Sequence, residues 1–336
     1  MRIGVTCDAG ADEEHALATR ALAVLGEAVV LPTDDALPQR LRELRPDIVL
    51  NLARGVGTPE RRLHIPALLE FLQIPFTGSD AVTHATCVAR PRLKATLAAH
   101  GIPTSGFAVV DSLRQLAPFA RRAFPVAVRR ARGVDSCFAT LVAHDFDELE
   151  SIASSLLDAS REPILVERFL PGDSFACSVL GNGPHAVALP VVAVPNDPFA
   201  AASPADLPPG TATGRPTSSP AVARIDDGLA EEIEALALRT VRALECRDLA
   251  RVDVRLSDAG VPNVCSVEPL PPFGERDGGA TRRAAQAAGL AVEELVQRCL
   301  VLAAERTGIA LPLTPPFPTL PRRGLAVGRS ARAFPA

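Results

Sequence analysis

The sequence predicts an α/β protein with a doubly wound parallel sheet at its N-terminus and an α+β arrangement in its C-terminal half. Strand-like and helix-like segments alternate at the start of the chain, and this alternation is typical of a parallel sheet with crossover helices. The expected strands are 1–7, 29–31 and 47–52, and the expected helices are 12–26 and 37–44. In the C-terminal half, two alternating segments joined by a turn at 257–260 predict an antiparallel hairpin over 251–268.

The composition bounds the class of protein. A chain of 336 residues with 47% hydrophobic content is long enough for about two or three domains with real cores. No apolar run is as long as a membrane span, and no leader-like segment opens the chain, so we expect a cytoplasmic protein that contacts no membrane. The net charge is −4 and the basic residues are spread along the chain, which argues against a nucleic-acid partner.

Cysteine and histidine usage argues against disulfides and against a metal cluster built from these residues. The seven cysteines are widely spaced and form no Cys-x-x-Cys pair, so we expect reduced thiols in the core. The six histidines are isolated from one another along the chain. His64 could contact a substrate or phosphate, although packing or capping is the commoner role for such a residue.

Several polar residues lie close to the carboxyl ends of the predicted parallel strands. Ligands of open α/β sheets gather at these ends, so the residues are candidates for a substrate cleft. They are Asp8, Asp12, Glu13 and Asn51. Ordinary solvated loop residues would explain the same pattern equally well.

The predicted hairpin carries the densest set of candidate functional residues. Strand residues two apart share a face, so Arg251, Asp253 and Arg255 should point one way, and Ser266 and Glu268 should share a face of the return strand. Asp253 and Glu268 would then meet across the pair, and two facing carboxylates suit Mg²⁺ bound together with phosphate oxygens. The alternative is an amphipathic surface hairpin whose charges are merely solvated.

Four motifs together resemble the D-alanine–D-alanine ligase family of the ATP-grasp superfamily. The hairpin reads Arg251-Val-Asp on one strand and Ser266-Val-Glu-Pro-Leu-Pro271 on the other. Ile65-Pro-Ala-Leu-Leu-Glu70 and Ile74-Pro-Phe-Thr-Gly-Ser79 are similar to the N-terminal motifs of that family. Val166-Glu-Arg-Phe-Leu-Pro-Gly172 is similar to the adenine-linker strand.

The resemblance implies an ATP-grasp fold and a set of domain boundaries. An N-terminal substrate-side α/β domain would span 1–80, and a central ATP-grasp subdomain would span 81–182. A C-terminal subdomain at 183–310 would carry the metal hairpin and a flexible lid loop at 195–224, followed by a flexible tail at 311–336. A helix is expected over 81–100.

The resemblance also implies roles for individual residues. Arg251 would stabilise the oxyanion of a tetrahedral intermediate, and Arg276 would read a substrate carboxylate. Asp12, Glu13 and His64 would lie on the substrate side of the site. Mg²⁺ would be held by Asp253 and Glu268. ATP would be held by Arg90, Lys94, Arg129, Ser136, Glu167, Phe169 and Leu170.

Several positions depart from the family pattern at points of chemistry. Ser266 stands where the family has an acidic ligand, Glu268 where it has an amide, and Ser174 where it has the glutamate that holds the ribose. The phosphate loop reads Gly133-Val-Asp-Ser136 instead of a glycine- and serine-rich sequence, and the lid has neither lysine nor tyrosine.

Three hypotheses for function follow. The first is an ATP-dependent carboxylate–amine ligase that acts through an acyl phosphate on an amino acid or dipeptide-like substrate, such as a precursor of peptidoglycan. The second is a catalytically degenerate homologue that binds a ligand or partner without ligation. The third is a structural subunit of a homodimer, a state that the resemblance also suggests.

Overall fold

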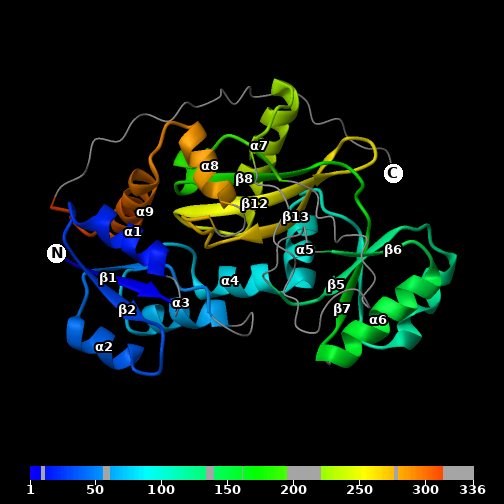
Figure 1. Ribbon diagram of the computed structural model, residues 1–336, viewed down its shortest axis with the longest axis horizontal. Helices are drawn as coiled ribbons and strands as arrows, with labels where there is room; N and C mark the ends of the chain where they lie inside the picture. The colour runs from blue at the N-terminus through cyan, green and yellow to red at the C-terminus, as the bar shows by residue number, and fades with distance from the viewer. Residues whose placement is uncertain are drawn as a thin grey trace.

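A computed structural model describes residues 1–8, 12–55, 61–133, 140–160, 162–194, 221–275 and 279–312. Their strands form three sheets. Figure 1 shows the parallel N-terminal sheet at one end of the molecule, a four-stranded sheet at the other end, and the C-terminal sheet above and between them. Among these residues, no helix combines the length and apolarity needed to cross a bilayer.

The N-terminal sheet confirms the expected parallel arrangement. Its strands run in the order β2 (Glu27–Pro32), β1 (Arg2–Cys7) and β3 (Ile48–Asn51), and both neighbours of β1 pair with it in parallel. The connecting helices are α1 (Asp12–Leu22) and α2 (Leu37–Leu44), and α3 (Arg61–Phe71) follows β3. Leu17 of α1 belongs to the same buried cluster as Leu295 of helix α9 (Val292–Thr307). The core of the N-terminal sheet therefore includes side chains of α9.

The segment 81–100 forms two helices instead of the single helix expected. They are α4 (Ala81–Val88) and α5 (Arg90–Ala99), and Ala89 between them has non-helical backbone angles. Pro91 accounts for the break, because proline has no backbone N–H to continue a preceding helix and is well suited to the first turn of the next one. The break allows Ala89 to pair with Arg132, which brings the start of α5 next to the central sheet.

The central sheet is antiparallel and carries its helices on one face. Its order is β4 (Phe107–Val110), β7 (Ile164–Arg168), β5 (Val126–Arg130) and β6 (Leu141–Ala143). The 3-10 helix η1 (Leu113–Arg121) and the helix α6 (Phe146–Ser160) contribute buried residues to the core of this sheet. The opposite face is left for the functional side chains described below.

The C-terminal sheet contains the predicted hairpin. Strands β12 (Leu249–Leu256) and β13 (Pro262–Glu268) pair antiparallel, and β12 also pairs with β8 (Ser174–Leu180). The remaining strands are β9 (Val187–Ala188), β10 (Val192–Val194) and β11 (Ala221–Val222). The end of the expected lid loop therefore differs from expectation, because 221–222 pairs with β10 as a strand; residues 195–220 lie outside the described chain.

Helices cover the C-terminal sheet and complete the main cores. These are the 3-10 helix η2 (Gly183–His185), α7 (Asp227–Ala243) and α8 (Ala280–Ala287), together with α9. α7 packs on β8 and β12 through Ile233 and Ala237. The six cysteines of the described chain are buried, and none of them forms a disulfide with another described cysteine.

Candidate active site

Two pockets open along β12, and together they hold most of the charged residues singled out in the sequence. The hairpin pocket encloses about 420 Å³, including its open mouth, and is lined by residues of α3, α4, α5, β12 and β13. The linker pocket encloses about 310 Å³ and is lined by residues of β5, β7, β12 and β13. Asp253 faces the hairpin pocket and Arg255, two residues along the same strand, faces the linker pocket.

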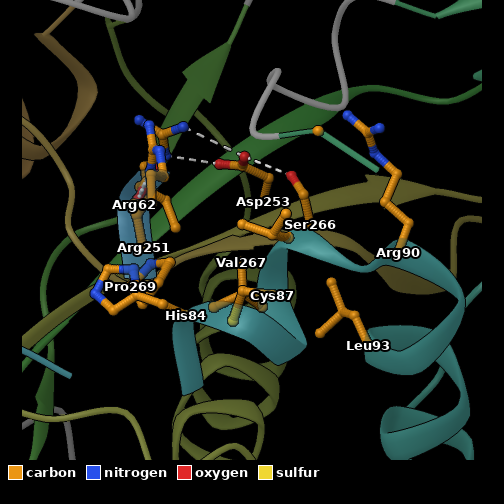
Figure 2. Close-up of a pocket in the computed structure, with 13 residues that line it drawn as sticks. Arg62, His84, Cys87, Arg90, Leu93, Arg251, Asp253, Ser266, Val267 and Pro269 are labelled. Carbon is orange, nitrogen blue, oxygen red and sulfur yellow. Dashed lines mark hydrogen bonds and ion pairs between the residues drawn. The ribbon is translucent and has the colours of Figure 1, made fainter. Parts of the chain in front are cut away.

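Asp253 is held by its own strand and by the return strand. Arg251 Nε donates to Asp253 Oδ1 over 2.8 Å, and Ser266 Oγ donates to Asp253 Oδ2 over 2.8 Å. Figure 2 shows these two contacts meeting at Asp253 inside the hairpin pocket. The carboxylate is therefore satisfied by protein donors.

The expected meeting of Asp253 with Glu268 does not occur. The register pairs Asp253 with Ser266 and Arg251 with Glu268, and an extra residue of β13, Cys265, shifts the register beyond this point. Glu268 instead forms a buried ion pair with Arg62 of α3. Both carboxylates line one pocket, but each is matched by an arginine.

The charge of Glu268 is maintained by its neighbours. Burial alone would raise the pKa of this carboxyl group, but Arg62, Arg251 and Arg54 outweigh burial and hold the pKa below its ordinary value. Glu268 Oε1 also accepts a hydrogen bond from the backbone N–H of Leu270 over 3.0 Å. Glu268 is therefore ionised at neutral pH and fixed in position.

Two other side chains in the hairpin pocket have nitrogen atoms without partners. Arg62 Nε and both ring nitrogens of His84 are buried and make no hydrogen bond. Burial, with a further contribution from Arg62, lowers the pKa of His84 to about 4, so its imidazole is neutral at physiological pH. In Figure 2, Arg62 and Arg251 lie on one side of Asp253 and Arg90 lies on the other, which makes the pocket rich in donors.

The linker pocket is organised around Glu167 of β7. Its carboxylate forms an ion pair with Lys94 Nζ over 2.5 Å, a second ion pair with Arg129, and a hydrogen bond from Ser105 Oγ over 2.9 Å. Burial raises the pKa of Glu167, but Arg129 and Lys94 outweigh it and lower the pKa to about 2. Residues from a helix and two strands thus meet at one buried carboxylate.

An aromatic residue and an aliphatic residue complete the linker pocket. Phe169 and Leu170 line it directly after β7, and the guanidinium of Arg255 lies 5.1 Å from the centre of the Phe169 ring. Arg90 lies at the entrance to α5 and lines the hairpin pocket, where it donates to the backbone oxygen of Arg130 over 2.7 Å. The structure thus brings Arg90, Lys94 and Arg129 to neighbouring parts of one site.

Comparison with known proteins gives the family. The model of the D-Ala–D-Ala ligase C-terminus matches residues 97–301. The chain belongs to the D-alanine–D-alanine ligase family. It is 31% identical to the D-alanine–D-alanine ligase of Cupriavidus metallidurans, covering 70% of each chain, and 30% identical to that of Gloeobacter violaceus, covering 83% of this chain and 90% of that protein.

Solved structures confirm that this family member has the ATP-grasp fold. The D-alanine–D-alanine ligase of Bacillus anthracis complexed with ATP matches with a TM-score of 0.68 at 19% identity, and covers 92% of this chain and 98% of that structure. The VanG D-Ala:D-Ser ligase of Enterococcus faecalis also matches with a TM-score of 0.68, covering 90% of this chain and 99% of that structure.

Some residues that the sequence suggested for the site of this family member line neither pocket. Glu13 and His64 are exposed and line neither one. Asp12 begins α1, but its side chain lies outside the described part of the structure, as do Ser136 and Arg276.

Other buried charged residues were missed from the sequence, and one of them, Arg62, lines the hairpin pocket. Glu14 is buried and pairs with Arg54, whereas its neighbour Glu13 is exposed. The helical spacing of Glu14 with Leu17 and Ala18, which are both buried, was the signal for the inward face. Arg62 likewise lies one turn before the buried Pro66 on α3, but nothing local in the sequence indicates its ionic partner.

The donor set does not fit a magnesium site. Mg²⁺ requires oxygen ligands that are available to the ion. Asp253 already accepts from Arg251 and Ser266, and Glu268 is paired with Arg62. Over the described ranges, no group of three or more acidic, histidine or cysteine side chains converges as a metal site would need. The role of Asp253 and Glu268 as metal ligands therefore stays a prediction, and in this structure each of them is paired with an arginine.

Proposed function

We propose that this protein is an ATP-dependent ligase that joins the carboxylate of one small molecule to the amine of another. The observation that carries the proposal is the convergence of Lys94 and Arg129 on Glu167 in a pocket that adjoins Arg251 across β12. Membership of the D-alanine–D-alanine ligase family supports the reaction class. The structure of the Bacillus anthracis relative was determined with ATP, which supports ATP as the nucleotide here.

The linker pocket would hold the nucleotide. Phe169 and Leu170 offer an apolar surface for the base, and the backbone of the linker strand around Glu167 offers polar groups for its edge. Lys94 and Arg129 would contact phosphate oxygens, which would share these cations with Glu167. Because both cations are almost fully buried, each contact would form at low local dielectric and would be strong.

The hairpin pocket would hold the reacting carboxylate. An oxygen of that carboxylate attacks the terminal phosphorus of ATP, the bond to the bridging oxygen breaks, and ADP leaves with the electron pair. The amine then attacks the carbonyl carbon of the acyl phosphate, loses a proton, and displaces inorganic phosphate. Arg251, which is 3% exposed, would stabilise the oxyanion of the tetrahedral intermediate.

A second candidate function is binding without ligation. The observation that favours it is the pairing of Asp253 with Arg251 and of Glu268 with Arg62, because those carboxylates are occupied by the protein itself. A degenerate homologue would bind a nucleotide or another anion in the same pockets and release no phosphate.

Two measurements separate these functions. Thermal unfolding with and without ATP tests the nucleotide site, since a ligand that binds only the folded state raises the melting temperature. Phosphate release is then screened over D- and L-amino acids singly and in pairs. ATP-dependent release that requires an amino acid supports the ligase, and a thermal shift with no release under any pair supports the binder. No shift at saturating ATP would overturn the ligase and would limit the second candidate to anions other than this nucleotide.

We also propose a homodimer acting in the cytoplasm, where ATP is supplied, and light scattering of the purified chain tests the oligomeric state. A mass corresponding to one chain of 35.3 kDa at working concentration would overturn the dimer.

A further inference from the structure

The hairpin pocket presents donors where a metal site would present acceptors. Arg62, Arg90 and Arg251 all line it, and its two carboxylates are each matched by one of these arginines. A cation entering this pocket would have to displace a guanidinium from a buried ion pair and would meet positive charge on both sides. An anion would meet the opposite field.

We infer that the hairpin pocket binds the terminal phosphate of the nucleotide, next to the reacting carboxylate, without a divalent cation, with Arg62 and Arg251 supplying the positive charge that a metal would otherwise bring. This inference rests on the proposed function, because it concerns how the same nucleotide is held. It adds the expectation that nucleotide binding does not depend strongly on Mg²⁺.

The charge balance of the two pockets supports the inference. Arginines outnumber carboxylates among the lining residues, with six arginines against Asp253, Glu268 and Glu167. Lys94 adds another cation next to the linker pocket through its contact with Glu167. One of the six, Arg168, is exposed and pairs with Asp258. ATP free of metal carries about four negative charges, and the remaining excess of cations offsets most of them.

Arg62 is the residue best prepared for an additional anion. It is 7% exposed, one of its terminal nitrogens pairs with Glu268, and its Nε is buried without a partner. A buried unsatisfied donor costs about 1–3 kcal/mol, which an incoming acceptor would recover. The planar guanidinium can serve a carboxylate and a phosphate oxygen at the same time, because its donors point in different directions.

His84 is a second unsatisfied group at the wall of the same pocket. Its exposed fraction is 0%, and neither ring nitrogen has a partner. As a neutral imidazole it can donate one hydrogen bond without adding charge. Two unpartnered buried side chains on neighbouring helices, α3 and α4, therefore line the same small volume.

Glu268 is assigned as a positioning residue for Arg62. It is held by the backbone N–H of Leu270 and in turn fixes the guanidinium. This role and a metal-ligand role predict opposite effects on substitution. Glu268→Gln would free Arg62 and make the pocket more positive, whereas loss of a metal ligand would weaken binding of the metal complex.

The test measures ATP binding to the full chain by calorimetry, in excess EDTA and in excess MgCl₂. We expect dissociation constants that agree within about threefold, since the protein supplies the counter-charge itself. A dissociation constant more than about tenfold tighter with magnesium would overturn the inference while leaving the proposed function intact. Absence of binding in both buffers would overturn both.

Three variants sharpen the test, each checked for folding by its thermal melting. Arg62→Gln should weaken ATP binding in EDTA by about tenfold, a typical effect for one buried charge-assisted contact. Glu268→Gln should bind ATP in either buffer at least as tightly as the unmodified chain. Arg40→Gln is the matched control, because it removes an arginine of α2 from an exposed ion pair with Asp34, outside both pockets, and should leave binding unchanged.

Two outcomes among folded variants would overturn the inference. One is unchanged binding in Arg62→Gln, which would mean that this arginine does not meet the phosphates. The other is a magnesium-specific loss in Glu268→Gln, which would identify Glu268 as a metal ligand. If Arg62→Gln does not fold, Arg62→Lys keeps the charge but not the planar guanidinium, and unchanged binding there would overturn the assignment of this guanidinium to Glu268 and a phosphate oxygen at the same time.

Discussion

Arg54 and Glu14 form a buried bidentate ion pair, with Nη1 to Oε2 at 2.8 Å and Nη2 to Oε1 at 2.9 Å. The same two side chains reach the segment after β13: Phe273 donates its N–H to Glu14 over 2.9 Å, and Arg54 Nε donates to the backbone oxygen of Leu270 over 3.2 Å. One ion pair therefore fastens the N-terminal sheet to the exit of the hairpin.

The first prediction concerns this pair. Arg54→Met leaves the Glu14 carboxylate buried beside an apolar chain and should lower the free energy of unfolding by about 3–5 kcal/mol. Urea denaturation measures the change. Arg40→Gln, which breaks the exposed pair with Asp34, should cost much less, and equal losses in the two variants would contradict the argument from burial.

The second prediction concerns acid unfolding through Glu167. Its pKa is lowered to about 2 from the ordinary 4.5, so its contribution to stability is complete above pH 4.5 and is lost as the pH falls toward 2. Glu167→Gln lacks this group, and the stability difference between the two proteins should therefore shrink through that window. Denaturation curves at a series of pH values measure it, and parallel pH profiles for both proteins would contradict it.

The third prediction concerns His84, whose pKa is lowered from 6.5 to about 4. The unfolded chain takes up a proton at a higher pH than the folded chain does, so stability should fall as the pH drops from 6.5 to 4. His84→Phe should lose this part of the decline. An NMR titration of the His84 ring, identified by its disappearance in the variant, reports the group directly, and a midpoint near 6.5 would refute the burial argument.

The fourth prediction concerns the contact between Gly133 and Arg90. A Cβ atom at Gly133 would lie 2.7 Å from Arg90 Nη1, and the backbone there has a φ of +153°. Gly133→Ala should displace the Arg90 side chain from the hairpin pocket and weaken ATP binding several-fold, with a small loss of stability from the backbone. Calorimetry and thermal melting measure the two effects. Gly106→Ala is the matched control, since a Cβ there meets nothing within 4 Å.

Much of the fold follows from patterns that are local in the sequence. The parallel N-terminal sheet and the β12–β13 hairpin were predictable because the spacing of apolar residues along the sequence indicates which side chains are buried. The break at Ala89 was also encoded locally, by Pro91, although the apolar pattern of 81–100 suggested one helix. The domain boundaries stay a prediction.

The site was predictable only in part. Lys94, Arg129 and Glu167 were named from motifs, and Lys94 and Arg129 both form ion pairs with Glu167 at the linker pocket. The partners of Asp253 and Glu268 were not predictable, because the register shift at Cys265 and the arrival of Arg62 from α3 depend on tertiary packing. A charged residue on a helix says little about which distant carboxylate it will meet.

Both pockets are lined by residues of β12, and this strand sets the distance between them. Asp253 and Arg255 are two positions apart on an extended strand, so their Cα atoms lie about 7 Å apart. The backbone of one strand would thus set the distance between the nucleotide and the reacting carboxylate. A single-residue insertion in this strand would turn one set of side chains to the opposite side of the sheet and uncouple the two halves of the reaction.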